Sequence, residues 1–178
     1  LFFFHPPAGI PDALWSRGLG DVYKRQSEFA KNAKIATDVN YSAKDAQFDT
    51  QKNLKVVRIT TIKERMLYDV TRFEVKAGQP VKLEFINPDA TPHNLVIVKP
   101  GSGDEVGLAA TRMAADPELA KSGQYIPNSD KVLFYTKMVP PIAGETLRFM
   151  APTKPGQYPY VCTFPGHWTI MRGVMVVK

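Results

Sequence analysis

The sequence predicts an all-β domain, a Greek-key β-sandwich or barrel of about eight short strands with one helical insertion. From residue 54 onward, short runs of apolar and β-branched residues recur, and turn-forming residues separate most of them. One Ala-rich stretch in this region has a helical period instead. Each of these elements can be justified from its own residues.

The clearest strand is residues 80–87, where Val81, Leu83 and Phe85 alternate with Lys82 and Glu84. Such alternation is typical of a strand with one face on the core and the other in water. The other predicted strands are 54–61, 67–75, 94–98, 132–136, 145–150, 156–162 and 173–177. Their short and regular spacing is what favours a sandwich or barrel.

The helical insertion is predicted at residues 105–122, between two of these strands. Val106, Ala110 and Met113 recur there at helical spacing. Asp116 and Pro117 then have the residue types of an N-cap and a first-turn proline, so a second short helix should begin at that point. We expect both helices to pack on the outside of the sandwich.

Three segments are expected along the chain. Residues 1–26 contain three prolines and three glycines without a sustained period, and they are similar to a translated cloning or sequencing scar. His5 and Trp15, which lie in this stretch, are therefore given no role. Residues 27–52 are interpreted as an N-terminal extension, and residues 53–178 as the folded domain.

Composition excludes several classes of function. The net charge is +6, but the basic residues are scattered and form no run or stripe of the kind that binds nucleic acid. No apolar run approaches the roughly 20 residues that a membrane-spanning helix needs. We therefore expect neither a nucleic-acid partner nor a membrane span.

The segment that points to chemistry runs from Cys162 to Met171 and includes His167. It lies between two predicted strands, so a thiol, an imidazole and a thioether share one loop whose ends are fixed by the sheet. His93 stands at a turn far upstream, and a Greek-key sandwich gathers loops from distant strands at one end. His93 could therefore meet this loop.

These donors suit copper. Two imidazoles and a thiolate in a trigonal set, with a weak axial methionine, are typical of a blue-copper electron-transfer site. Taken singly, each residue has an ordinary alternative, because free cysteine is usually a small buried apolar residue and methionine usually fills gaps in a core. The joint spacing C-x4-H-x3-M, with His93 upstream, is what favours one copper ion per chain bound by His93, Cys162, His167 and Met171.

The loop CTFPGH, followed by x3-M and Gly173, resembles the ligand loop of the azurins and of the azurin- and plastocyanin-like cupredoxins. His93 followed by Asn94 is similar to the upstream ligand pair of that family. The resemblance covers roughly residues 65–178, including the helical insertion. It implies a cupredoxin-like fold and electron transfer by a type 1 copper centre.

The resemblance also implies roles for single residues. His93, Cys162 and His167 would be equatorial ligands and Met171 the axial one, whereas Met175 lies inside the last predicted strand and is a poor rival. Outside the ligand set, Asn94 would tie the two loops together, and Phe164 would shield the copper. The chain departs from the azurins in two ways: its single cysteine cannot form their disulfide, and Pro92 replaces the expected glycine, although its carbonyl remains available as a weak axial oxygen.

The function expected from this site is electron transfer without substrate turnover. Electrons would leave at the edge of His167, inside an apolar partner patch of Trp168, Pro165 and Met138. Partners would be redox proteins such as a c-type cytochrome, an oxidase or a dehydrogenase. The resemblance implies a periplasmic or other extracytoplasmic location.

Other functions fit these residues less well. The chain could be the electron-accepting copper domain of a larger redox enzyme, but catalysis within the chain is disfavoured, because it has only three histidines. A dinuclear site with two thiolates is excluded by the single cysteine. A nucleophilic Cys162–His167 pair would leave His93 and Met171 unexplained. Structural zinc rarely uses methionine as a ligand. Copper storage or delivery is disfavoured, because a closed site with four ligands retains its metal.

Overall fold

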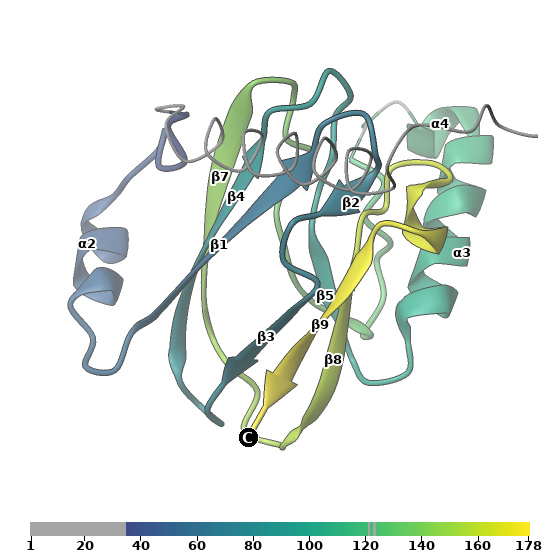
Figure 1. The fold of residues 1–178 in the computed structure, drawn as a ribbon. Helices are drawn as coiled ribbons and strands as arrows, with labels where there is room; N and C mark the ends of the chain where they lie inside the picture. The colour runs from purple at the N-terminus through teal and green to yellow at the C-terminus, as the bar shows by residue number, and fades with distance from the viewer. Residues whose placement is uncertain (1–34, 121, 123) are drawn as a thin grey trace, which may run out of the picture. The chain divides into compact units, whose positions relative to one another are not determined.

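The structure is a computed structural model that describes residues 35–120, 122 and 124–178. In it, two β-sheets pack face to face. The predicted all-β class is confirmed: within the described residues, nine strands account for both sheets (Figure 1). The expectations for residues 1–26, with His5 and Trp15, lie outside the described residues.

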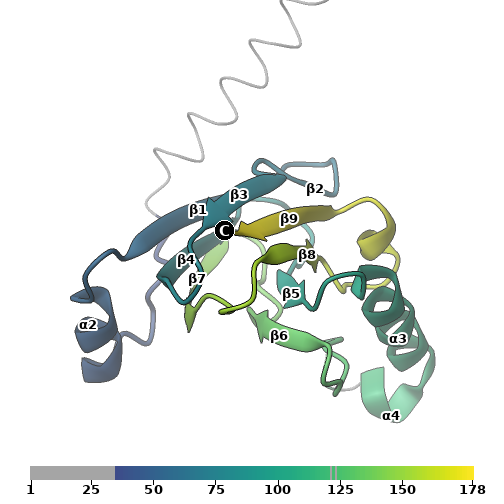
Figure 2. The same ribbon diagram turned by 90° about the horizontal axis from the view of Figure 1, so that it is seen from below.

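The first sheet has the strand order β2-β1-β4-β7 and the second has the order β3-β9-β8-β5-β6. The strands of the first are β1 (Lys55–Ile62), β2 (Leu67–Tyr68), β4 (Pro80–Asn87) and β7 (Ala143–Met150). Those of the second are β3 (Arg72–Val75), β5 (Val96–Val98), β6 (Val132–Tyr135), β8 (Gly156–Val161) and β9 (Arg172–Val177). The pairs β1–β4 and β3–β9 are parallel and the rest antiparallel. Seen from below, the two sheets form two layers (Figure 2).

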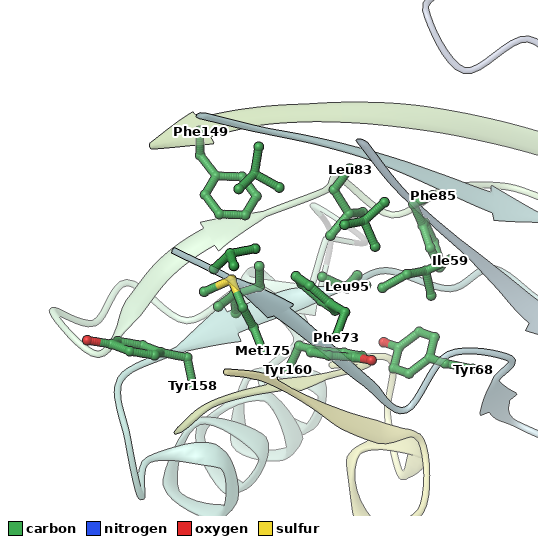
Figure 3. Close-up of a cluster of buried hydrophobic side chains, with 14 of the residues drawn as sticks. Ile59, Tyr68, Phe73, Leu83, Phe85, Leu95, Phe149, Tyr158, Tyr160 and Met175 are labelled. Atoms are coloured by element: carbon green, nitrogen blue, oxygen red, sulfur yellow. The ribbon is translucent and has the colours of Figure 1, made fainter. Parts of the chain in front are cut away.

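The core fills the space between the sheets (Figure 3). The predicted alternation of β4 is observed: Leu83 and Phe85 are fully buried, whereas Lys82 and Glu84 are partly exposed. Met175 of β9 contributes from the opposite sheet. Each such buried side chain contributes about 1.5–3 kcal/mol through the hydrophobic effect.

The segment predicted as one strand at 67–75 is two strands, because the chain changes sheets within it. Tyr68 ends β2 beside β1, and Phe73 lies in β3 beside β9. Asp69 holds the crossover: its amide donates to Thr60 O, and its carboxylate accepts from Thr60 N at 2.6 Å. Sequence periodicity did not reveal this break, since both pieces have strand character.

The helical insertion between β5 and β6 is present as predicted. The helices of the described residues are α2 (Ala43–Asp49), α3 (Gly103–Ala115), α4 (Pro117–Ala120) and the short 3-10 helix η1 (His167–Thr169). Val106 and Ala110 bury one side of α3 on the outside of the second sheet, and the Asp116 carboxylate accepts from the first amides of α4. None of these helices is long and apolar enough to cross a membrane.

The described residues before β1 are attached to the first sheet through Arg148 of β7. The guanidinium of Arg148, whose side chain is 8% exposed, makes paired hydrogen bonds of 2.8–3.1 Å with Asp38 and Asp49. Lys82 of β4 also donates to Asp49, at 3.0 Å. The hydrogen bond from Arg148 is the main reason why the pKa of Asp49 lies well below its usual range. Part of the segment interpreted as an extension therefore packs on the domain.

We expect Arg148→Met to lower the free energy of unfolding by about 3 kcal/mol, because it leaves two carboxylates without their main partner. The matched control is Arg58→Met, which removes an exposed partner of Glu84 and should cost less than about 1 kcal/mol. Urea denaturation measures both. Equal losses for the two variants would contradict a structural role for the Arg148 cluster.

Candidate metal centre

His93 reaches the centre from the connection between β4 and β5. Its backbone forms an isolated bridge with Val139: His93 N donates to Val139 O at 3.1 Å, and Val139 N donates back at 2.8 Å. Its side chain has no exposed surface. The backbone on both sides of the imidazole is therefore fixed before any metal binds.

The second part of the centre is the loop between β8 and β9. Cys162 N donates to Met171 O at 3.0 Å, and Met171 N donates to His167 O at 2.8 Å, so the loop closes on itself. Gly166, at φ 82°, allows the turn that starts η1 and brings His167 back toward Cys162. A local turn thus brings together residues that the sequence spaces five and nine positions apart.

Three donor atoms converge at this point. The Cys162 Sγ lies 3.8 Å from His93 Nδ1 and 3.7 Å from His167 Nδ1, and the two nitrogens are 3.2 Å apart. The centre of that triangle is about 2.1 Å from each atom, close to the bond lengths of about 2.0–2.3 Å that imidazole and thiolate make to zinc in proteins. The arrangement is that of a trigonal site for one metal ion.

Burial sets the protonation states of these three groups. It lowers the pKa of His167 to about 4, with a further contribution from His93, and it lowers the pKa of His93 as well. Burial also raises the pKa of the Cys162 thiol to about 11. At neutral pH both imidazoles are therefore neutral and ready to bind, whereas the thiol keeps a proton that an incoming metal must displace.

Comparison with known proteins assigns the metal. The sequence profile of the copper binding proteins of the plastocyanin/azurin family matches residues 54–178. The chain belongs to this family. Copper is therefore the metal for which the His93, Cys162 and His167 site is built.

Individual relatives agree with the assignment. Auracyanin-A of Chloroflexus aurantiacus is 34% identical over 118 residues, which are 65% of this chain and 69% of that protein. Auracyanin-B of the same organism is 29% identical, over 69% of this chain and 52% of its own length. Among solved structures, the reduced auracyanin of Roseiflexus castenholzii aligns with a TM-score of 0.62 and 34% identity, covering 70% of this chain and 97% of that one. These likenesses support the cupredoxin fold.

The residues predicted to surround the metal lie close to the three donor atoms or to the segments that carry them. Asn94 joins the two loops: its Nδ2 donates to Thr163 Oγ1 and its Oδ1 accepts from Thr163 N, each at 2.8 Å. The half-buried ring of Phe164 lies 4.7 Å from that of His167, centroid to centroid. Pro92 is half-buried just before His93. Met171 has no exposed surface and belongs to the same buried cluster as Cys162.

Trp168 is held by α3. Its indole Nε1 donates to Thr111 Oγ1 at 3.0 Å, and the Arg172 guanidinium lies 5.9 Å from its ring centre. A Cβ added to Gly107 would lie only 2.2 Å from the indole Cδ2, so the ring covers this glycine closely. Helix α3 thus supports η1 and, through it, His167.

Sequence reasoning missed Thr163, Gly107 and Asp89. Thr163 and Gly107 are ordinary residue types in a loop and a helix, and their roles depend on contacts with distant residues. Asp89 lies four positions before His93 in the sequence, and its carboxylate contacts the His93 imidazole. No spacing rule links such residues to a metal site.

We expect Gly107→Ala to displace the Trp168 ring, and with it His167. The overpacking should cost about 1–3 kcal/mol of stability and alter the visible and electron paramagnetic resonance spectra of the copper form. Gly103→Ala is the matched control on the same helix, because its new Cβ would meet its nearest neighbour at an ordinary 3.5 Å. An unchanged spectrum in Gly107→Ala would show that α3 does not support the ligand loop.

Proposed function

We propose that the protein is an electron carrier with one type 1 copper centre, bound by His93, Cys162 and His167 with Met171 as the axial ligand. Copper supplies a one-electron couple between Cu(I) and Cu(II). The observation that carries the proposal is the buried triangle of one sulfur and two imidazole nitrogens, which is sized for a single ion. The thiolate favours Cu(I), and the imidazoles also accept Cu(II).

The surroundings of these residues favour rapid electron exchange. His93 is fixed by its backbone bridge to Val139, and Cys162 by the backbone of Met171. Asn94 crosslinks the two segments through Thr163. Because the donors are already in place, little rearrangement is needed when the charge of the metal changes, and no substrate has to enter the site.

His167 is the proposed exit for electrons. His93, Cys162 and Met171 have no exposed surface, whereas 7% of His167 is exposed. The half-buried residues Pro165, Trp168 and Met138 form the proposed partner patch. Small, largely apolar contacts suit brief encounters between redox proteins, so the proposed partners are a c-type cytochrome, an oxidase or a dehydrogenase.

We also propose a periplasmic or other extracytoplasmic location. Family membership supports this location, and it supports an electron carrier over an enzyme. A role as the electron-accepting domain of a larger redox enzyme uses the same copper centre and the same exit at His167. A separate electron carrier and a domain of a larger enzyme both require the partner patch to be accessible.

We expect Cu(II) to give the purified protein an intense blue colour that Cys162→Ser abolishes, because the colour arises from the thiolate–copper bond. Visible absorption measures this. Met175→Leu is the control, since Met175 is a buried core residue of β9 and its loss should leave the colour unchanged. In Met171→Leu the spectrum should shift but persist. A blue colour that survives in Cys162→Ser would overturn the proposed ligand set.

We expect Pro165→Glu to slow electron exchange with a c-type cytochrome several-fold while the copper spectrum stays the same, because a charge in the patch disfavours apolar docking. Stopped-flow absorption measures the rate. Val56→Glu adds the same charge at an exposed position on β1 and serves as the control. If both variants react at the same rate as the parent protein, docking does not use this patch.

A further inference from the structure

The imidazole of His93 has a buried partner on the side opposite the donor triangle. Its Nδ1 faces Cys162 and His167, and its Nε2 lies 3.3 Å from Asp89 Oδ2. Of the two side chains, that of His93 is 0% exposed and that of Asp89 is 5% exposed. Asp89 therefore lies one imidazole ring away from the metal position and is shielded from water.

The Asp89 carboxylate is held in place by the backbone. Its Oδ2 accepts from Glu64 N at 3.2 Å, and its Oδ1 accepts from Ala90 N at 2.7 Å. The Asp89 amide in turn donates to Asn87 Oδ1 at 3.1 Å. With both oxygens bonded, the carboxylate cannot rotate freely away from His93.

Asn87 connects this arrangement to the segment that carries His93. Its Oδ1 also accepts from Thr61 Oγ1 at 2.9 Å, and its Nδ2 donates to Val139 O at 3.0 Å. Val139 is the residue whose backbone bridges to His93. The same buried network thus fixes the backbone of His93 and the carboxylate that faces its ring.

This contact has a chemical consequence for His93. When Nδ1 binds the metal, the ring proton is on Nε2, which can then donate to Asp89. A carboxylate that accepts from a ligand imidazole fixes its tautomer and orientation and increases its basicity. Within the described residues, Asp89 forms an ion pair with His93, so the carboxylate acts on the centre directly through this ring.

We propose that Asp89 is a positioning residue that lowers the reduction potential of the centre through His93. A buried negative charge favours the more positive oxidation state of a nearby ion, because a protein interior screens charges less than water does. The Asp89–His93 contact therefore stabilises the oxidised form relative to the reduced one. The inference rests on the proposed role of His93 as a copper ligand.

Asp89→Asn tests the charge while keeping the shape and an acceptor oxygen. The blue colour of the Asp89→Asn variant should persist. At a fixed potential, the ratio of reduced to oxidised protein should rise about tenfold, which corresponds to a rise in reduction potential of about 59 mV for a one-electron couple. A redox titration followed by visible absorption measures the ratio. Asp89→Glu, which retains the charge, should stay closer to the parent protein.

Asp69→Asn is the matched control. Asp69 also bonds to the backbone at a sheet crossover, through Thr60 N, but within the described residues its carboxylate makes no hydrogen bond or ion pair with His93, Cys162 or His167. Its neutralisation should change the ratio much less. Equal ratios in Asp89→Asn and Asp69→Asn would overturn the proposal, whereas a colourless parent protein would instead overturn the proposed function.

A second measurement needs no variant. Reduced copper is diamagnetic, so nuclear magnetic resonance of the parent protein can observe the His93 Nε2 proton. We expect this proton to exchange slowly with water, because it is buried and donates to Asp89. Exchange as fast as that of an exposed imidazole would overturn the proposal, even if Asp89→Asn failed to fold.

Discussion

The structure depends on one constraint: a sulfur and two nitrogen atoms must meet within the bonding distance of a single ion, inside a core from which water is excluded. Such a meeting is unfavourable unless the groups are neutral or bound to metal, because burial penalises charge. The chain satisfies this condition through the depressed pKa values of His93 and His167 and the raised pKa of Cys162. Metal binding then replaces the thiol proton.

The two sheets make this meeting possible. β5 and β8 are hydrogen-bonded neighbours, so residues at their ends, Asn94 and Thr163, can crosslink the two ligand-bearing segments. The site lies at the edge of the main core, because Cys162 belongs to both, and Met171 is a member of the same core. Rigidity at the metal is therefore continuous with the packing of the sandwich.

Support for the two histidines comes from different sides of the molecule. Helix α3 reaches His167 through Trp168, which covers Gly107, whereas the turns at the end of the first sheet reach His93 through Asp89. The first support is largely apolar and the second is charged. The two ligands can thus be adjusted separately, one by packing and the other by electrostatics.

The sequence alone predicts the β class and the helical insertion, and of its proposed metal-binding residues the structure brings His93, Cys162 and His167 together. Alternation in residues 80–87 identifies a half-buried strand, and the five-residue spacing of Cys162 and His167 places a thiol and an imidazole in one short loop. Local signals of this kind survive without tertiary information, because they depend on backbone period and short spacing.

The way in which distant segments meet depends on the assembled fold. The crossover at Asp69 divides a predicted strand between two sheets, Trp168 packs against Gly107, and Asp89 faces the far side of His93. Each of these features depends on contacts between residues that the sequence does not link by any period. Burial and proximity, which give these residues their roles, arise only when both sheets are assembled.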